Sequence, residues 1–376
     1  MEKGIERRDF IKALGCFMLY TSLGSAGIQI SGCSKNRAIK IQGKEALYYS
    51  KLKGEAVQCE LCPDNCVISK WERGFCRVRE NRDGNLFTLV YGNPCAVHVD
   101  PIEKKPLFHV LPGSSAFSIA TAGCNFRCKN CQNWEISQKT PEETANYDLS
   151  PERTVEEAII AEASVIAYTY SEPVVFYEYM LETSKIASEK SIINIFHSNG
   201  FINEKPLREV SKYLKAANID LKGITPKFYD EVCEGELEPV LKALKILKEE
   251  DVFTEITNLV ISDYNDKEDD IRGLSKWIYQ NLGEKTPVHF SRFYPMYQMK
   301  NIAPTPIDTL RRARGIALSE GLKYVYIGNY PGIPEENTYC HNCDKEIIKR
   351  SGYEILDNQI IDGICGFCKE EIPGIW

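Results

Sequence analysis

The sequence has no excess of positive charge, no internal repeat and no low-complexity segment. Its 46 lysines and arginines are outnumbered by 53 aspartates and glutamates, which gives a net charge of −7. This balance gives no electrostatic reason to expect nucleic-acid binding, because proteins of that class neutralise phosphates with basic surfaces. The sequence also lacks a long uninterrupted apolar run. Its weakly apolar stretch 13–30 contains glycine, serine and glutamine, so it is a poor permanent membrane span.

Cysteine is abundant, with 15 residues in a chain of 376. Most of the cysteines stand in C-x2-C or C-x3-C pairs, and in a chain this long such pairing indicates metal ligation rather than a disulfide scaffold. The apolar fraction of 43% and the charged fraction of 26% are ordinary for a folded globular protein. The length predicts two or three domains, or one large α/β domain with small attachments.

The first 33 residues differ in kind from the rest of the chain. The stretch Arg7–Lys12 is similar to a twin-arginine export signal, and Ile30–Cys33 is similar to a lipoprotein box whose cleavage leaves Cys33 lipid-modified. We therefore expect residues 1–33 to be a signal segment that makes the chain an exported, membrane-anchored lipoprotein. The alternative is a frayed tail or an interfacial helix on a cytoplasmic protein.

Residues 113–330 alternate between short β-rich runs and amphipathic helices, which predicts parallel strands joined by right-handed crossovers. We expect strands at 117–121, 165–170, 192–197, 217–221, 253–260, 288–293 and 324–327. Six or seven such units fit an α/β fold, a partial or complete TIM-like (β/α) barrel, whose chemistry sits at the carboxyl ends of the strands. We expect a small cysteine-rich module at 34–112 and a zinc-ribbon-like module at 331–376 on either side of the barrel.

One short loop follows the first predicted barrel strand and holds Cys124, Cys128 and Cys131 in a C-x3-C-x2-C pattern. Three thiolates can hold three corners of an iron–sulfur cube, whereas four would close it. One iron is then free to bind another ligand. A zinc site here would need a fourth protein ligand or a water, and no histidine lies nearby in the sequence.

This loop resembles that of the radical S-adenosylmethionine (SAM) superfamily. The resemblance implies a site-differentiated 4Fe-4S cluster on Cys124, Cys128 and Cys131, with SAM chelated at the open iron. It further implies that an external low-potential electron donor feeds the cluster, and that reductive cleavage of SAM gives a 5′-deoxyadenosyl radical that abstracts hydrogen from a substrate. The cofactors supply this chemistry, and the protein positions them and excludes water.

The second predicted strand ends in a turn that resembles the Gly-Gly-Glu-Pro turn of the superfamily, which implies that Glu172 accepts a hydrogen bond from the amino group of SAM. Tyr170 and Ser171 replace the two glycines. The alternative role for Glu172 is that of an ordinary carboxylate at a helix start. Near the end of the sixth strand, His289 and Arg292 are candidates for the pocket, and a core or surface role is an equal alternative for each.

Further cofactor contacts are implied at the ends of later strands. Ser198 and Asn199 stand in a His-Ser-Asn-Gly sequence that resembles the ribose-binding turn of activating enzymes. Asp220 and Lys222 resemble the Asp-x-Lys pair of glycyl-radical activases, and alternation places both on one face of their strand. The alternative for this pair is a surface ion pair. Trp134 is expected to form the apolar wall that an aromatic residue before the third cysteine forms in relatives.

Two other cysteine sets predict metal sites. The C-terminal C-x2-C…C-x2-C pattern is typical of a structural zinc ribbon, and its members are Cys340, Cys343, Cys365 and Cys368. The N-terminal pattern C-x2-C-x3-C-x9-C could close either a zinc site or an auxiliary iron–sulfur cluster, and its members are Cys59, Cys62, Cys66 and Cys76. Cys95 and Cys233 are expected to be plain core residues.

Four longer stretches resemble the radical enzyme of the AmmeMemoRadiSam system, which is related to pyruvate formate-lyase activating enzymes. They are Cys-Glu-Leu-Cys-Pro at 59–63, Val-Asp-Pro-Ile-Glu-Lys-Lys-Pro at 99–106, Cys-Gln-Asn-Trp-Glu-Ile-Ser at 131–137 and Ile-Pro-Gly-Ile-Trp at 372–376. The resemblance implies an oxidoreductase-like activating enzyme with AMMECR-type and Memo-type partner proteins, and it discloses no substrate. Two alternatives stay open, namely an electron-transfer or metal-handling protein with fully ligated clusters, and a zinc-ribbon binding module. The Glu-Pro turn favours the enzyme.

Overall fold

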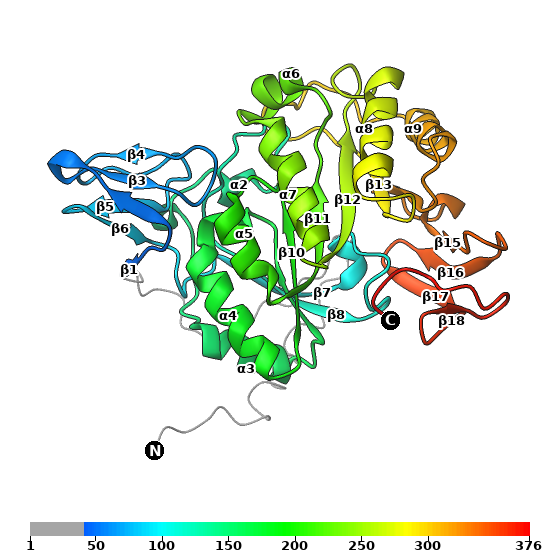
Figure 1. Ribbon diagram of the computed structural model, residues 1–376, viewed down its shortest axis with the longest axis horizontal. Coiled ribbons are helices and arrows are strands. Elements are labelled where there is room, and N and C mark those ends of the chain that lie inside the picture. The colour runs from blue at the N-terminus through cyan, green and yellow to red at the C-terminus, as the bar shows by residue number, and fades with distance from the viewer. Residues whose placement is uncertain (1–40) are drawn as a thin grey trace, which may run out of the picture.

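The computed structural model describes residues 41–376, so the signal-like segment with Cys33 lies outside the described residues. Its centre is one eight-stranded sheet in the order β14-β13-β12-β11-β10-β9-β8-β7 (Figure 1). The strands are β7 (Ala96–Pro101), β8 (Ser115–Ala120), β9 (Val165–Tyr168), β10 (Ile193–Ser198), β11 (Leu214–Asp220), β12 (Phe253–Val260), β13 (Val288–Arg292) and β14 (Val325–Gly328).

Strands β8 to β14 run parallel, and β7 pairs antiparallel with β8 at one edge. Within residues 41–376, β14 and β7 do not pair with each other, so the sheet is an open, partial barrel. The prediction of an α/β, TIM-like architecture is therefore confirmed in its partial form. Strand β7 was missed, because it is an antiparallel edge strand outside the strand–helix repeat from which the barrel was predicted.

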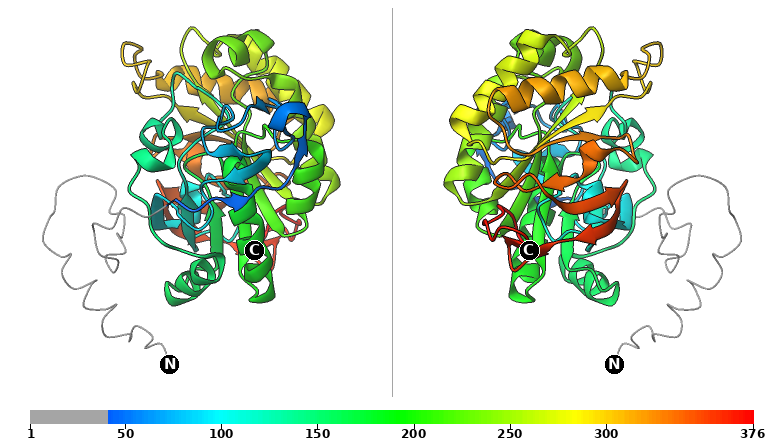
Figure 2. Two further views of the ribbon diagram at one scale, coloured as in Figure 1. Left: turned by 90° about the vertical axis from the view of Figure 1, so that its left-hand side faces the viewer. Right: turned by 90° about the vertical axis from the view of Figure 1, so that its right-hand side faces the viewer.

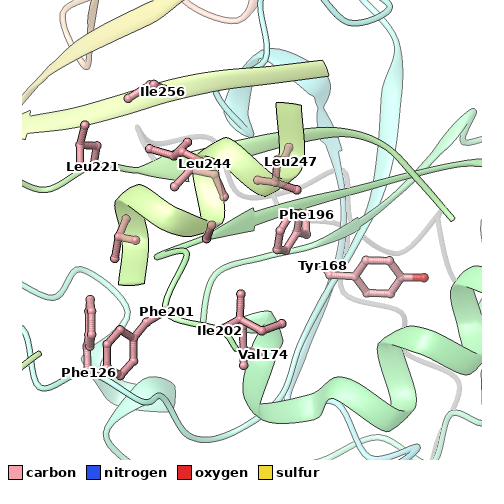
Figure 3. Packing of buried hydrophobic residues seen from close by; sticks show 14 of the residues in the cluster. Phe126, Tyr168, Val174, Phe196, Phe201, Ile202, Leu221, Leu244, Leu247 and Ile256 are labelled. Carbon is pink, nitrogen blue, oxygen red and sulfur yellow. The ribbon is translucent and has the colours of Figure 1, made fainter. Parts of the chain in front are cut away.

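Helices cover the outer face of the sheet, as the crossover rule requires. The long ones are α3 (Pro151–Ile160), α4 (Tyr177–Glu189), α5 (Glu204–Ser211), α7 (Leu237–Glu249), α8 (Glu268–Asn281) and α9 (Ile307–Ser319). Leu244 and Leu247 of α7 lie against the side of the sheet that carries Phe196 and Ile256 (Figure 3), and all four side chains are buried. Truncating one such leucine to alanine costs about 2–5 kcal/mol. No helix within 41–376 is both long enough and apolar enough to span a bilayer.

The N-terminal module consists of two small sheets on one side of the barrel (Figure 1). One contains β1 (Lys44–Glu45), β6 (Asn85–Thr88) and β5 (Arg79–Arg82), and the other contains β2 (Tyr49–Lys51), β3 (Val57–Cys59) and β4 (Val67–Ile68). The expected boundary at residue 112 needs correction, because β7 already belongs to the barrel sheet. The change from cysteine-rich to cysteine-poor sequence does not mark where the barrel begins.

The C-terminal module lies on the opposite side of the barrel, and Figure 2 shows the two modules facing the viewer in turn. It contains β15 (Thr338–Tyr339), β16 (Glu346–Ser351), β17 (Glu354–Asn358), β18 (Ile360–Ile361) and β19 (Ile364–Cys365). Arg350 of β16 joins it to the barrel: the buried guanidinium donates to the Phe108 carbonyl at 2.8 Å and stacks over the Phe108 ring.

A buried polar network closes the amino-terminal end of the barrel. Glu255 of β12 accepts hydrogen bonds from the His109 backbone N–H at 2.7 Å, and its Oε2 lies 2.6 Å from His289 Nε2. All three residues are at most 1% exposed. The expectation that His289 lies near the end of its strand is therefore wrong. Strand β13 begins at Val288, so His289 belongs to the floor of the barrel and not to its mouth.

Candidate active site

The C-x3-C-x2-C loop leaves the carboxyl end of β8, at the mouth of the barrel. Cys128 is buried, and Cys124 and Cys131 are partly exposed. The Phe126 backbone N–H donates to Cys124 Sγ at 3.3 Å, and Cys131 Sγ lies 3.1 Å from Ser137 Oγ. Short-range hydrogen bonds therefore orient two of the three sulfur atoms.

Backbone contacts fix the loop to the segment that follows β11. The N–H of Arg127 donates to the Cys233 carbonyl at 2.8 Å, and the N–H of Lys129 donates to the Val232 carbonyl at 2.9 Å. Cys233 was expected to be a plain core residue, but its thiol interacts with Cys128. A hydrogen bond from Cys233 lowers the pKa of Cys128, and the neighbouring Lys222 ammonium acts in the same direction. No local sequence spacing connects positions 128 and 233, so this contact could not be predicted from the sequence.

The three thiols fit a cluster better than a single ion. A single metal ion needs three or more ligand atoms close together. Within residues 41–376, only the C-terminal cysteines have three or more possible ligand atoms within 4.8 Å of one another, so the sulfurs of this loop are spaced more widely than that. Burial raises the pKa of Cys124 well above its ordinary value, and the Glu172 carboxylate adds to that effect. A thiolate here therefore needs a cationic partner, which the irons of a 4Fe-4S cluster would supply.

Glu172 is 3% exposed, and its carboxylate accepts several hydrogen bonds. Oε1 accepts from Ser198 Oγ at 2.6 Å and from the Val174 backbone N–H at 3.1 Å, and Oε2 accepts from the Asn199 backbone N–H at 2.8 Å. Burial raises its pKa despite these donors. The Val174 contact caps the 3-10 helix η4 (Pro173–Phe176), so the helix-start role is present together with the placement beside Cys124.

Ser198 and Asn199 join the glutamate turn to the cysteine loop. The Asn199 side-chain amide donates to Asn125 Oδ1 at 2.8 Å, and Asn125 in turn donates to the Phe201 carbonyl at 2.8 Å. Asn125 lies directly after Cys124 in the chain. The structure therefore brings Glu172, Ser198 and Asn199 together with the first cysteine of the loop.

Asp220 and Lys222 form an ion pair of 2.8 Å at the end of β11, and Asp220 Oδ1 lies 2.9 Å from His197 Nε2. Their side chains are only 27% and 19% exposed, so the pair is not an ordinary surface ion pair. Burial opposes the charge of Lys222, but Asp220 and Cys128 raise its pKa well above the ordinary value. Burial likewise opposes the charge of Asp220, but Lys222 and His197 hold its pKa below the usual range.

Trp134 begins the short helix α2 (Trp134–Ser137), directly after the cysteine loop. Its indole stacks on the Tyr297 ring with a centroid separation of 5.2 Å and an interplanar angle of 13°. The pair presents a partly exposed aromatic surface. Tyr297 was not predicted, since it comes from the loop after β13, far away in the sequence.

Tyr170 keeps the backbone conformation that a glycine would supply in the turn before Glu172. Its φ is +62°, in the left-handed region that glycine adopts readily. Its carbonyl accepts a hydrogen bond from the Asn133 amide at 2.7 Å. Replacement of the glycine by tyrosine therefore preserves the turn, at a cost of about 1–3 kcal/mol in backbone strain.

The Tyr170 side chain contacts a cluster of polar residues in β7 and the segment after it. This cluster was not predicted from the sequence. The Tyr170 hydroxyl donates to Asp100, and its ring lies 4.4 Å from Lys105 Nζ and edge-on to His98. Lys105 is 1% exposed and pairs with Asp100 at 2.6 Å. The sequence feature that could have pointed to these residues is the stretch 99–106. It carried a family resemblance, but it did not indicate where these side chains lie.

The four C-terminal cysteines have the geometry of a single-ion site. Their donor atoms all lie within 4.8 Å of one another, with Cys340 and Cys368 sulfurs 3.6 Å apart and Cys343 and Cys365 sulfurs 3.8 Å apart. Tetrahedral zinc with Zn–S bonds of about 2.3 Å separates its sulfurs by about 3.8 Å. His341 instead bonds to Tyr324 and Glu370, so it is not part of the set.

Comparisons with known proteins agree with this geometry. The model of the radical SAM superfamily matches residues 118–274, from β8 to the middle of α8. The chain is 46% identical over 331 residues to the uncharacterized protein MJ0808 of Methanocaldococcus jannaschii, which covers 88% of this chain and 98% of MJ0808. The chain therefore belongs to one family with MJ0808, and its residues 118–274 form a radical SAM superfamily domain, which makes it an enzyme of that class.

Solved structures show more distant likenesses. A domain of the pyruvate-formate lyase-activating enzyme from Bacteroides vulgatus is 16% identical, covers 43% of this chain and 98% of that chain, and has a TM-score of 0.39. SuiB of Streptococcus suis bound to its precursor peptide SuiA is 14% identical, covers 61% of this chain and 51% of that chain, and has a TM-score of 0.46.

Proposed function

We propose that this chain is an activating-type radical SAM enzyme: a 4Fe-4S cluster on Cys124, Cys128 and Cys131 and SAM together supply a 5′-deoxyadenosyl radical that takes hydrogen from a substrate in the barrel. The observation that carries the proposal is the hydrogen-bonded link, through Asn199 and Asn125, between the cysteine loop and a buried carboxylate. Glu172 stands beside Cys124 and is held by Ser198 and Asn199.

The chain offers charges of both signs to an amino-acid-like ligand at the mouth. The Glu172 carboxylate provides an acceptor for an ammonium group, and the Lys222 ammonium provides a donor for a carboxylate. Asp220 keeps Lys222 charged and holds it in place through their 2.8 Å ion pair. The aromatic surface of Trp134 and Tyr297 suits a flat base, since such stacking contributes about 0.5–1.5 kcal/mol.

A connected set of polar side chains extends from the turn before Glu172 and favours a polar substrate group over a hydrocarbon. Its members are Asp100, Lys105 and Tyr170. The hydroxyl of Tyr170 donates to Asp100, so the ring is held in one orientation, and its backbone carbonyl is fixed by Asn133. We place the substrate between this set and the cysteine loop.

The test is anaerobic reconstitution, reduction with dithionite and assay of 5′-deoxyadenosine. The Cys128→Ala variant should lose both the cluster signal and the product, because it removes the buried ligand. Cys95→Ala is the matched control: it removes a free thiol that precedes β7, and it should retain both. Retained cleavage in Cys128→Ala, or a reduced cluster that yields no product in the unaltered chain, would refute the proposal. The second result would favour an electron-transfer protein.

Partners and location are further proposals that rest on the sequence. We propose a low-potential electron donor and AMMECR-type and Memo-type partner proteins on the family resemblance, zinc in the C-terminal cysteine set, and export with a lipid anchor at Cys33 on the signal-like segment. Labelling with an acyl-chain probe tests the last of these. Loss of label in Cys33→Ala is expected, and an unprocessed, unlabelled wild-type chain would contradict it.

A further inference from the structure

The four N-terminal cysteines lie around one cavity beside the barrel. Cys59 ends β3, Cys62 and Cys66 stand in the β3–β4 turn, and Cys76 lies between β4 and β5. All four line the cavity, and within residues 41–376 all four are free thiols. The fold of the module therefore brings together residues that lie up to 17 positions apart in the chain.

Neither these thiols nor those of the catalytic loop reach the close spacing of the C-terminal set. Among the described residues, the C-terminal cysteines alone have three or more donor atoms within 4.8 Å of one another. A single zinc would hold its sulfurs about 3.8 Å apart. An iron–sulfur cube separates its cysteine sulfurs more widely, because each sulfur binds a different iron. The wider spacing of the N-terminal set therefore favours a cluster over zinc.

The lining of the cavity supplies the other groups that a cluster needs. Ile68, Val174 and Val175 give it an apolar wall. The Phe75 backbone N–H donates to Cys66 Sγ at 3.5 Å, as the Phe126 N–H does to Cys124 in the catalytic loop. Hydrogen bonds to the sulfurs and exclusion of water are the means by which proteins set cluster potentials.

Arg79 provides an independent observation. It lines the cavity, it is 1% exposed, and it pairs with Glu178 at 3.0 Å through Nη1. Its Nε is buried and has no hydrogen-bond partner in the part of the chain that the structure describes. A buried N–H without an acceptor costs about 1–3 kcal/mol. A sulfide or thiolate of a bound cluster would supply the missing acceptor.

The cavity adjoins the catalytic loop. Asn125, the neighbour of Cys124, is one of its lining residues. On the other side of the contact, a Cβ built on Gly123 would lie 2.8 Å from the Cys76 carbonyl oxygen. Cys62 and Cys66 are partly exposed and Cys59 and Cys76 are buried, so the set runs from the surface toward the catalytic cysteines.

We infer that Cys59, Cys62, Cys66 and Cys76 hold a second 4Fe-4S cluster, with every iron ligated by the protein, and that it passes single electrons to the catalytic site. The relay role rests on the proposed function, and the identity of the metal does not. A reduced one-electron donor protein, such as a flavodoxin or ferredoxin, is oxidised by one electron at the exposed side. The second cluster is reduced and then reoxidised as the same electron reduces the catalytic site. No bond forms or breaks in this step.

Metal analysis of the full chain tests the site. In the triple variant Cys124→Ala, Cys128→Ala, Cys131→Ala, about four irons per chain and an iron–sulfur EPR signal after dithionite should remain. The wild-type chain should hold about eight irons, which answers the same question without a substitution. A triple variant that holds about two zincs and no iron, one zinc more than the C-terminal set accounts for, would overturn the assignment, and so would a triple variant that holds no metal beyond that one zinc. Neither count depends on whether SAM is cleaved.

The relay is tested with the double variant Cys62→Ala, Cys66→Ala. It should lose the second cluster, keep the EPR signal of the catalytic one, and form 5′-deoxyadenosine with dithionite at the wild-type rate. With reduced flavodoxin as the donor, the rate should fall by about tenfold or more. An equal fall with both reductants would show a structural role, and no fall with flavodoxin would show that electrons enter elsewhere. Either result would refute the relay.

Discussion

Replacement of Gly123 by alanine tests whether the N-terminal module and the catalytic loop depend on close contact. Gly123 has a φ of +95°, and an added Cβ would lie 2.7 Å from Val78 Cγ1 and 2.8 Å from the Cys76 carbonyl oxygen. The second contact is to backbone, so it cannot be relieved by a change of rotamer. Gly283 is the matched control, since its φ is +116° and a Cβ there would meet nothing within 4 Å.

The two substitutions share a backbone strain and differ in the clash. A non-glycine residue at such a φ costs about 1–3 kcal/mol, and overpacking adds about 1–3 kcal/mol. Gly123→Ala should therefore lower the free energy of unfolding by about 2–6 kcal/mol, whereas Gly283→Ala should lower it by about 1–3 kcal/mol. Because Gly123 directly precedes Cys124, the first variant should also bind less iron.

The assay is urea unfolding of the reduced, metal-free chain, followed by far-UV circular dichroism, together with iron content after anaerobic reconstitution. Gly283→Ala should keep the wild-type iron content. If Gly123→Ala is no less stable than Gly283→Ala and binds iron as the wild type does, the contact between module and loop does not constrain the site. The reasoning that places Cys76 against the catalytic loop would then be wrong.

Further predictions concern the cofactor site and the C-terminal module. Glu172→Gln should weaken SAM binding about 10- to 150-fold, because a hydrogen bond to a charged group contributes about 1.5–3 kcal/mol. The control Glu189→Gln, at an exposed position, should leave SAM binding unchanged. Titration calorimetry measures both affinities. Burial raises the pKa of Glu172, so wild-type SAM affinity should fall with decreasing pH from a higher pH than an ordinary glutamate would give, and Glu172→Gln should remove that dependence. Trp134→Ala should raise the KM for SAM about 2- to 10-fold, whereas Trp71→Ala, 59% exposed, should leave it unchanged. Cys365→Ser should release the C-terminal metal and lower thermal stability while iron content stays constant; loss of iron as well would contradict separate sites.

The sequence predicted the parallel strands of the barrel because each is a short, local run of β-forming residues. The strand at 253–260 agrees with β12 at both ends. Strand β7 was missed although Val97, His98, Val99 and Asp100 alternate between apolar and polar side chains, because this antiparallel edge strand is not part of the strand–helix repeat from which the barrel was predicted. The domain boundary at 112 failed for the same reason.

The site was predictable where its chemistry is local and unpredictable where it depends on the approach of distant segments. The cysteine loop, the turn at Glu172 and the Asp220–Lys222 pair are short motifs, and the structure gathers them at one end of the sheet. The contact of Cys233 with Cys128, the stacking of Tyr297 on Trp134 and the bond from Tyr170 to Asp100 join segments 70 to 163 positions apart. No spacing rule relates such positions.

The floor of the barrel explains why access must be from the mouth. His109 Nδ1 lies 2.6 Å from the Pro373 carbonyl, which can only accept, so Nδ1 carries the proton and Nε2 accepts from the Tyr326 hydroxyl at 2.6 Å. Burial lowers the pKa of His109 to about 4, which keeps this neutral form at physiological pH. This series of hydrogen bonds continues to Thr338. Its hydroxyl lies 3.0 Å from the Tyr326 hydroxyl and accepts a hydrogen bond from Arg350 Nη1 at 2.7 Å.

His109, Tyr326, Thr338 and Arg350 are buried and are hydrogen-bonded to one another in that order, so opening the floor would remove the partners of several polar groups at once. The C-terminal module, which supplies Thr338, Arg350 and Pro373, therefore closes the amino-terminal end of the barrel and leaves the end with the cysteine loop as the entrance. Stability and chemistry are thereby assigned to opposite ends of the same strands, as is general for barrels of this kind. The C-terminal cysteines, which have the geometry of a single-ion site, belong to the module that closes the barrel. The N-terminal cysteines and the catalytic cysteines lie at the open end.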